Sequence, residues 1–122
     1  MPRVIFVDDD PDILDTIKRG LVHLFKYKVD TFTSPLKSLS DFEPGKYHFA
    51  LLDVDMPEMD GFALARELIR RDRKLIIAFL SGVRNIEDRF AQEFPELTPD
   101  HLLTKPIGLT NLSDAIHKLL KL

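Results

Sequence analysis

The sequence contains no cysteine, and this absence excludes disulfide bonds and thiolate metal sites. It also has no apolar run as long as a membrane span, and its first residues lead directly into a predicted strand rather than a signal peptide. Basic residues are not in excess, because the sequence has 17 Lys and Arg, which are scattered, and 20 Asp and Glu. This balance argues against direct nucleic-acid binding. We therefore expect a cytoplasmic protein that binds neither a membrane nor nucleic acid.

Strand and helix patterns alternate five times along the 122 residues, without a repeat, low-complexity stretch or linker. Strands are predicted at residues 3–7, 28–33, 47–53, 75–80 and 102–104. Helices are predicted at residues 11–25, 35–42, 62–71, 86–94 and 109–119. Because crossovers between parallel strands are right-handed, the pattern predicts an α/β fold. We expect a single domain over residues 1–122, a doubly wound five-stranded parallel sheet with five helices on both faces.

Local signals refine three of these elements. Asp10 followed by Pro11 is typical of a helix start, with Asp10 as the N-cap residue. Residues 28–33 form the most polar strand and are expected at a sheet edge, whereas residues 75–80 are apolar on both faces, as in a central strand. The buried face of the first helix is predicted from apolar residues at helical spacing, namely Ile13, Ile17, Leu21 and Leu24.

Reactive side chains stand at the ends of four of the five predicted strands. Asp8 and Asp9 follow the first, Asp53 ends the third, Ser81 follows the fourth and Lys105 follows the fifth. In open α/β sheets the ligand site lies at the carboxyl ends of the strands. We therefore expect these groups to meet at one edge of the sheet.

Three carboxylates close together in a partly desolvated cleft raise one another's pKa unless a cation neutralises them. Oxygen ligands without histidine or cysteine favour Mg²⁺ or Mn²⁺ as that cation. Lys105 supplies a point charge and Ser81 a hydroxyl donor, which together suit phosphoryl oxygens. Asp53 is then placed as a nucleophile that forms an acyl phosphate.

From about Val4 to Leu120, the chain resembles the receiver domain of two-component response regulators. The resemblance rests on an ordered set of motifs: Asp8-Asp9, then Asp53 in the stretch Leu-Asp-Val-Asp-Met-Pro-Glu-Met-Asp-Gly at residues 52–61, then Ser81, then Lys105-Pro106. Each motif is weak alone, but the ordered combination is highly specific. It implies the flavodoxin-like strand order 2-1-3-4-5 seen in chemotaxis regulators.

The resemblance also implies a magnesium site and a phosphoacceptor. Asp53 would accept the phosphoryl group from a phosphohistidine of a sensor histidine kinase or a histidine phosphotransfer protein. Asp9 would ligate Mg²⁺ directly and Asp8 mainly through water, with Asp53 and the backbone carbonyl of Asp55 as the other protein ligands. The Asp55 carboxylate lies where this family tunes hydrolysis of the acyl phosphate.

In such a domain Ser81 and Lys105 would bind the phosphoryl oxygens, and Ser81 would move toward the phosphorylated aspartate. The changed surface would then act on a downstream effector domain or protein, or form a phosphorylation-dependent dimer. One departure concerns Leu102, which stands where the family often has an aromatic switch residue. Such a domain catalyses only its own phosphoryl transfer and autodephosphorylation.

Two other functions are consistent with the sequence. Asp53-Val54-Asp55 resembles the Asp-x-Asp motif of haloacid-dehalogenase-type phosphatases, although that family places the motif on its first strand and usually has a cap domain. A pseudo-receiver that serves only as a scaffold is the other alternative. The pattern ends with the last helix, which leaves open a stand-alone receiver or a piece of a longer regulator.

Overall fold

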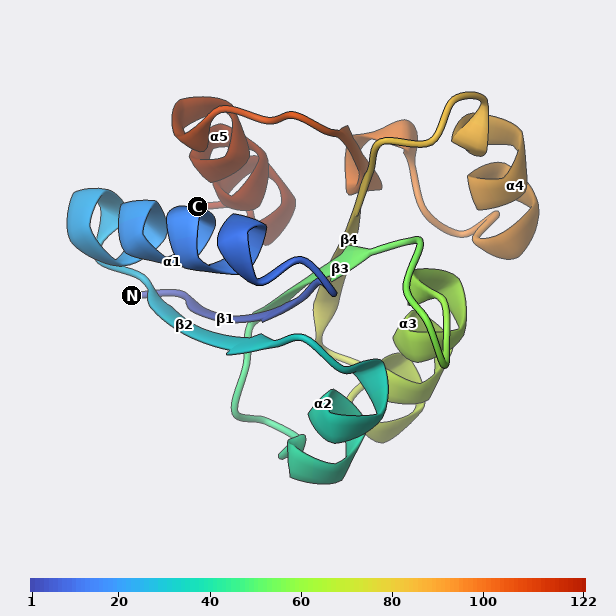
Figure 1. The fold of residues 1–122 in the computed structure, drawn as a ribbon, viewed down its shortest axis with the longest axis horizontal. Coiled ribbons are helices and arrows are strands. Elements are labelled where there is room, and N and C mark those ends of the chain that lie inside the picture. Colours follow the sequence, from blue (N-terminus) through green and yellow to red (C-terminus); the bar gives the residue numbers. More distant parts are fainter.

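The protein is a five-stranded parallel sheet covered by helices on both faces (Figure 1). The computed structural model describes all residues 1–122. The strands are β1 (Arg3–Val7), β2 (Lys28–Phe32), β3 (Phe49–Asp53), β4 (Ile76–Ser81) and β5 (Leu102–Thr104). The helices are α1 (Pro11–Phe25), α2 (Pro35–Asp41), α3 (Gly61–Arg71), α4 (Ile86–Glu93) and α5 (Leu109–Leu120), with a 3₁₀ turn η1 (Pro99–His101) before β5. The order β2-β1-β3-β4-β5 confirms the predicted topology.

The sheet separates two hydrophobic cores, and β4 contributes to both. Ile77 and Phe79 belong to the core under α2, α3 and α4, whereas Ala78 and Leu80 belong to the core under α1 and α5. This double burial explains why β4 is apolar without alternation, as predicted for a central strand. β2 lies at the edge of the sheet, as its polarity predicted. None of the helices has the length and apolarity needed to cross a membrane.

The first helix corrects one sequence prediction. Ile17 and Leu21 are buried as expected, but Leu24 is 67% exposed. Leu24 lies one residue before the end of the helix, and Lys26 directly after it adopts a left-handed conformation (φ 62°). The side chain buried just beyond this end is Tyr27, which belongs to the core under α1 and α5.

The third strand begins later than predicted, at Phe49 rather than Tyr47. Tyr47 is nevertheless buried, because its ring stacks on Phe42 with centroids 6.0 Å apart and its hydroxyl donates a 2.6 Å hydrogen bond to Asp30 Oδ2. Its burial therefore comes from side-chain packing under the sheet edge and not from strand pairing.

Candidate functional site

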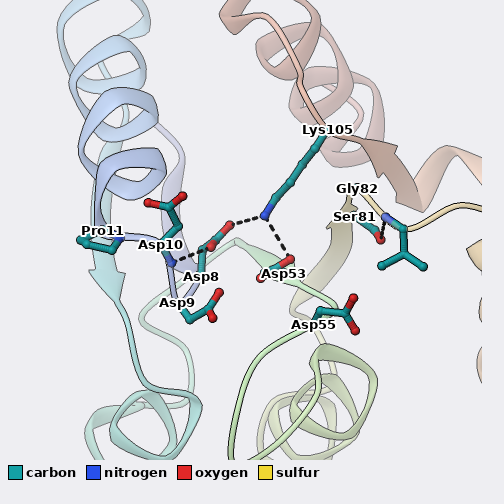
Figure 2. A pocket seen from close by; sticks show the side chains of 10 residues that line it. Asp8, Asp9, Asp10, Pro11, Asp53, Asp55, Ser81, Gly82 and Lys105 are labelled. Atoms are coloured by element: carbon teal, nitrogen blue, oxygen red, sulfur yellow. Dashed lines mark hydrogen bonds and ion pairs between the residues drawn. The ribbon is translucent and has the colours of Figure 1, made fainter.

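Four strand ends bring the predicted side chains to one edge of the sheet (Figure 2). Asp8 follows β1, Asp53 ends β3, Ser81 ends β4 and Lys105 follows β5. Ser81 pairs with Thr104 across β4 and β5, and its carbonyl accepts a 2.9 Å hydrogen bond from the Lys105 amide. The convergence thus follows directly from the parallel register of the sheet.

These side chains line a cavity of about 560 Å³. Its ten lining residues are Asp8, Asp9, Asp10, Pro11, Asp53, Asp55, Ser81, Gly82, Val83 and Lys105. All six residues predicted for the site are among them. Acidic side chains dominate the lining and Lys105 is its one cation, which makes the cavity suited to a cation and a phosphoryl group together.

Different local interactions determine the conformation of the two loops that carry the carboxylates. Asp10 caps α1, since its Oδ1 accepts hydrogen bonds from the amides of Asp12 (3.0 Å) and Ile13 (3.4 Å), as predicted. After β3, the Gly61 amide donates to the Val54 carbonyl at 2.9 Å. A Cβ atom at position 61 would lie 2.2 Å from the Asp53 carbonyl oxygen, so only glycine allows this return of the chain.

The carboxylates of Asp8, Asp9 and Asp53 can each offer an oxygen within 4.8 Å of the others, with Asp8 and Asp53 buried and Asp9 exposed. Asp8 Oδ1 accepts a 2.9 Å hydrogen bond from the Asp10 amide. Asp8 Oδ2 is fully buried, and its one partner is the Lys105 ammonium, which lies 3.0 Å away and is shared with Asp53. Three neighbouring carboxylates with a single ammonium among them fit a hard divalent cation such as Mg²⁺.

Lys105 reaches across the cavity to both buried carboxylates, with Nζ 3.2 Å from Asp53 Oδ1 (Figure 2). Burial raises the pKa of Asp53 to about 6, and the charge of Asp8 adds to this rise while Lys105 opposes it. For Lys105, burial lowers the pKa, but contact with Asp8 and the charge of Asp53 outweigh it and raise the pKa above 10.5. Lys105 therefore stays charged, and an additional cation would stabilise the ionised form of Asp53.

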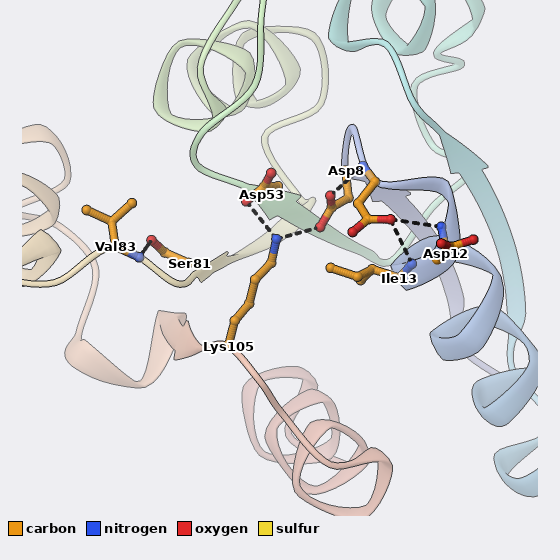
Figure 3. Close-up of polar contacts among 8 residues, drawn as sticks. Asp8, Asp12, Ile13, Asp53, Ser81, Val83 and Lys105 are labelled. Atoms are coloured by element: carbon orange, nitrogen blue, oxygen red, sulfur yellow. Dashed lines mark hydrogen bonds and ion pairs between the residues drawn. The ribbon is translucent and has the colours of Figure 1, made fainter.

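The Ser81 hydroxyl contacts the backbone and not Asp53 or Lys105. It accepts a 3.0 Å hydrogen bond from the Val83 amide, whereas Lys105 contacts Asp8 and Asp53 (Figure 3). Ser81 is buried whereas Val83 is 43% exposed. Since the Ser81 oxygen only accepts in this contact, its hydroxyl proton stays available to be donated to another group.

The sequence prediction did not include Gly82 and Val83 as part of this cavity. Gly82 has no side chain to obstruct the cavity, and a Cβ there would lie 3.6 Å from Lys105 Cβ. Their position directly after Ser81, at the end of a predicted strand, is the sequence feature that could have indicated them.

The chain matches the family model described as the response regulator receiver domain over residues 4–117. It is 32% identical over 120 residues to the transcriptional regulatory protein PrrA of Mycobacterium tuberculosis, covering 98% of this chain and 50% of that protein. It is 27% identical over 118 residues to the aerobic respiration control sensor protein ArcB of Escherichia coli, covering 93% of this chain and 15% of that protein. The chain thus spans at most about half the length of these relatives.

Solved structures show the same fold. The response regulator protein TrrA from Thermotoga maritima, determined in complex with Mg²⁺ and BeF, superposes with a TM-score of 0.83 at 25% identity, over 98% of this chain and 99% of that one. A response regulator receiver domain protein from Clostridium thermocellum superposes with a TM-score of 0.87 at 24% identity, over 99% and 95% of the two chains.

Proposed function

Because this chain belongs to the response regulator receiver domain family, we propose that it accepts a phosphoryl group on Asp53 and changes its binding surface in response. The family is a signalling family and not one of classical enzymes. The observation that carries the proposal is the position of Asp53, buried at the end of β3 between an acidic pair and Lys105.

In the proposed transfer, an Asp53 carboxylate oxygen attacks the phosphorus of a phosphohistidine. The new oxygen–phosphorus bond makes an acyl phosphate, the phosphorus–nitrogen bond breaks, and the imidazole nitrogen keeps the bonding electron pair. Such a transfer has a loose, in-line transition state and depends mainly on positioning and charge neutralisation.

Asp8, Asp9 and Asp53, with the backbone carbonyl of Asp55, would hold Mg²⁺. The bound ion would offset the charge of the carboxylates and of the phosphoryl oxygens. The donor set supports this assignment, because Asp8 and Asp53 share Lys105 as their one cationic partner. A further cation would oppose the rise in the Asp53 pKa that burial and the charge of Asp8 cause. The Mg²⁺ and BeF complex of TrrA shows that a structural relative binds such a pair.

Lys105 would bind one phosphoryl oxygen, since its Nζ already lies 3.2 Å from Asp53 Oδ1. Ser81 would donate a hydrogen bond to another oxygen after leaving the Val83 amide. That change would free the backbone after β4 and shift the segment leading into α4. The outcome of phosphorylation is then a changed surface rather than a released product.

The proposed donor is a sensor histidine kinase or histidine phosphotransfer protein, and the proposed recipient of the signal is an effector domain, an effector protein or a second copy of the chain. PrrA is a transcriptional regulator and ArcB a sensor protein, so relatives of this chain occur in both settings. We place this exchange in the cytoplasm.

The test is thermal unfolding of the metal-free protein with and without Mg²⁺ plus beryllofluoride, a mimic of the acyl phosphate. The mixture is expected to raise the melting temperature of the wild-type protein and not that of Asp53→Asn. Asp15→Asn, an exposed position on α1, serves as the matched control and should respond as wild type does. Equal shifts in wild type and Asp53→Asn would rule out Asp53 as the acceptor. Steady turnover of small phosphomonoesters would instead identify a phosphatase.

A further inference from the structure

Two arginines cross between α3 and the α4 region in opposite directions. Arg66, on α3, places its guanidinium 4.0 Å from the ring centroid of Phe94, the C-cap residue directly after α4. The same guanidinium pairs with Glu96 at 2.9 Å. Arg66 thus contacts one aromatic ring and one carboxylate beyond its own helix.

Arg89 mirrors this arrangement from the other side. It lies on α4, with its guanidinium 4.9 Å from the ring centroid of Phe62 in the first turn of α3, and it pairs with Asp60. The cation–π contact and the ion pair act on the same group, and both would be lost together if α4 moved away. Figure 1 places α4 beside α3, at the right of the view.

α4 depends on such contacts because it has little stability of its own. It is eight residues long, and its N-cap residue Asn85 (φ 60°) makes no side-chain capping hydrogen bond. Only Ile86 and Phe90 within the helix are buried. Short helices without caps rely on tertiary contacts to form, so the position of α4 is sensitive to the arginine on its surface.

Asp60 connects this contact to the loop that leaves Asp53. One of its oxygens, Oδ1, accepts a 2.9 Å hydrogen bond from the Ala63 amide and caps α3, while Oδ2 pairs with Arg89. The next residue, Gly61, packs directly on the Asp53 backbone. A shift of residues 54–60 would therefore carry the Asp60 carboxylate with it.

We propose that the Asp60–Arg89 contact is a mechanical link that couples the loop of residues 54–60 to α4. Opening of the loop then loosens α4, and opening of α4 then loosens the loop, since coupling between two elements is reciprocal. The signalling use of this link rests on the proposed phosphorylation of Asp53, but the link itself is a property of the protein without ligand.

The expected effect is modest, because the side chains of Arg89 and Asp60 are 45% and 32% exposed. A half-exposed ion pair together with one cation–π contact corresponds to a change of roughly two- to tenfold in local opening. Amide hydrogen exchange measures such local openings separately for each segment.

The experiment compares hydrogen exchange of the full chain, without metal, in wild type and in two variants. Arg89→Gln, on α4, is expected to speed exchange of residues 54–60 by roughly two- to tenfold. Asp60→Asn keeps an N-cap side chain for α3, since asparagine caps as well as aspartate, and is expected to speed exchange in α4. Arg70→Gln removes an ion pair internal to α3, with Glu67, and should change neither segment.

In each variant the exchange of α5 should stay at its wild-type rate, which separates local coupling from a general loss of stability. The proposal is wrong if each substitution affects only its own element. It is also wrong if α5 accelerates as much as the other segments do.

A second arm adds Mg²⁺ and beryllofluoride. In wild type both residues 54–60 and α4 should change their exchange, whereas in Arg89→Gln the change should persist at residues 54–60 and fall by at least half in α4. An equal α4 response in both proteins would overturn the link and leave the proposed function standing. No response at residues 54–60 of wild type would contradict the proposed function, while the metal-free comparison still decides the link.

Discussion

Lys105 Nζ lies 3.2 Å from Asp53 Oδ1, so the cation and the carboxylate of this site meet although 52 residues separate them in the sequence. The same ammonium lies 3.0 Å from Asp8 Oδ2. In the protein without metal, Lys105 is therefore the only cation in the cavity that offsets two buried carboxylates.

Removal of this cation should destabilise the metal-free protein. Lys105→Met leaves Asp8 and Asp53 without a neutralising partner, and we expect a loss of about 1–3 kcal/mol in the free energy of unfolding, measured by urea denaturation in a chelator. Lys118→Met is the matched control, because the Lys118–Asp100 pair is exposed and should be worth less than about 1 kcal/mol. Equal losses in the two variants would contradict the role given to Lys105.

Removal of the acceptor charge should have the opposite effect. Burial raises the pKa of Asp53 to about 6, so at pH 7 its ionised form is less stable in the folded protein than in the unfolded chain. We expect Asp53→Asn to raise the free energy of unfolding of the metal-free protein at pH 7 by about 1–3 kcal/mol. Asp15→Asn should change it by less than about 0.5 kcal/mol. A less stable Asp53→Asn protein would show that its contact with Lys105 outweighs the burial.

His48, which lies outside this site, is expected to make a pH-dependent contribution to the free energy of unfolding. Its Nδ1 accepts a 3.0 Å hydrogen bond from the Arg3 amide. His48 is an exposed residue, and the partial desolvation of its ring, followed by the charges of Arg3 and the N-terminus, lowers its pKa below 6.5. The hydrogen bond therefore contributes fully above pH 6.5 and is lost as the pH falls through the lower pKa of the folded state.

NMR titration of the His48 ring in folded and urea-unfolded protein measures this difference. The folded value should be the lower one. His48→Asn keeps an acceptor for the Arg3 amide but does not titrate, so its stability should depend less on pH between 8 and 5. A folded His48 pKa at or above the unfolded one would refute this assignment.

Lys26 offers a test of backbone conformation without change in packing. It is exposed and directly follows α1 as its C-cap residue with φ 62°, a region that glycine occupies without steric cost. We expect Lys26→Gly to raise the free energy of unfolding by about 0.5–1 kcal/mol in thermal or urea denaturation. Lys28→Gly, two residues later in edge strand β2, should lower it by about as much. Loss of stability in both variants would show that the charge of Lys26, rather than its backbone, matters at this position.

The sequence by itself determined the element order and the position of each reactive group along the chain. Asp53, Ser81 and Lys105 each stand at or just after the end of a strand, and a parallel sheet brings all such ends to one edge whatever the packing details. That is why the convergence on one cavity could be predicted, while the chemical roles of these residues stay predictions. The strand order itself came from the family resemblance and not from the periodicity.

Only the tertiary structure decided where individual side chains point. Leu24 has the spacing of a core residue but is exposed, whereas Tyr27, just beyond the end of α1, is buried in the core. The Ser81 hydroxyl accepts a hydrogen bond from the Val83 amide, and Arg89 on α4 forms an ion pair with Asp60 at the start of α3. Local periodicity specifies which face of an element is apolar, whereas these contacts depend on how separate elements pack against one another, and no pattern within a single segment encodes that.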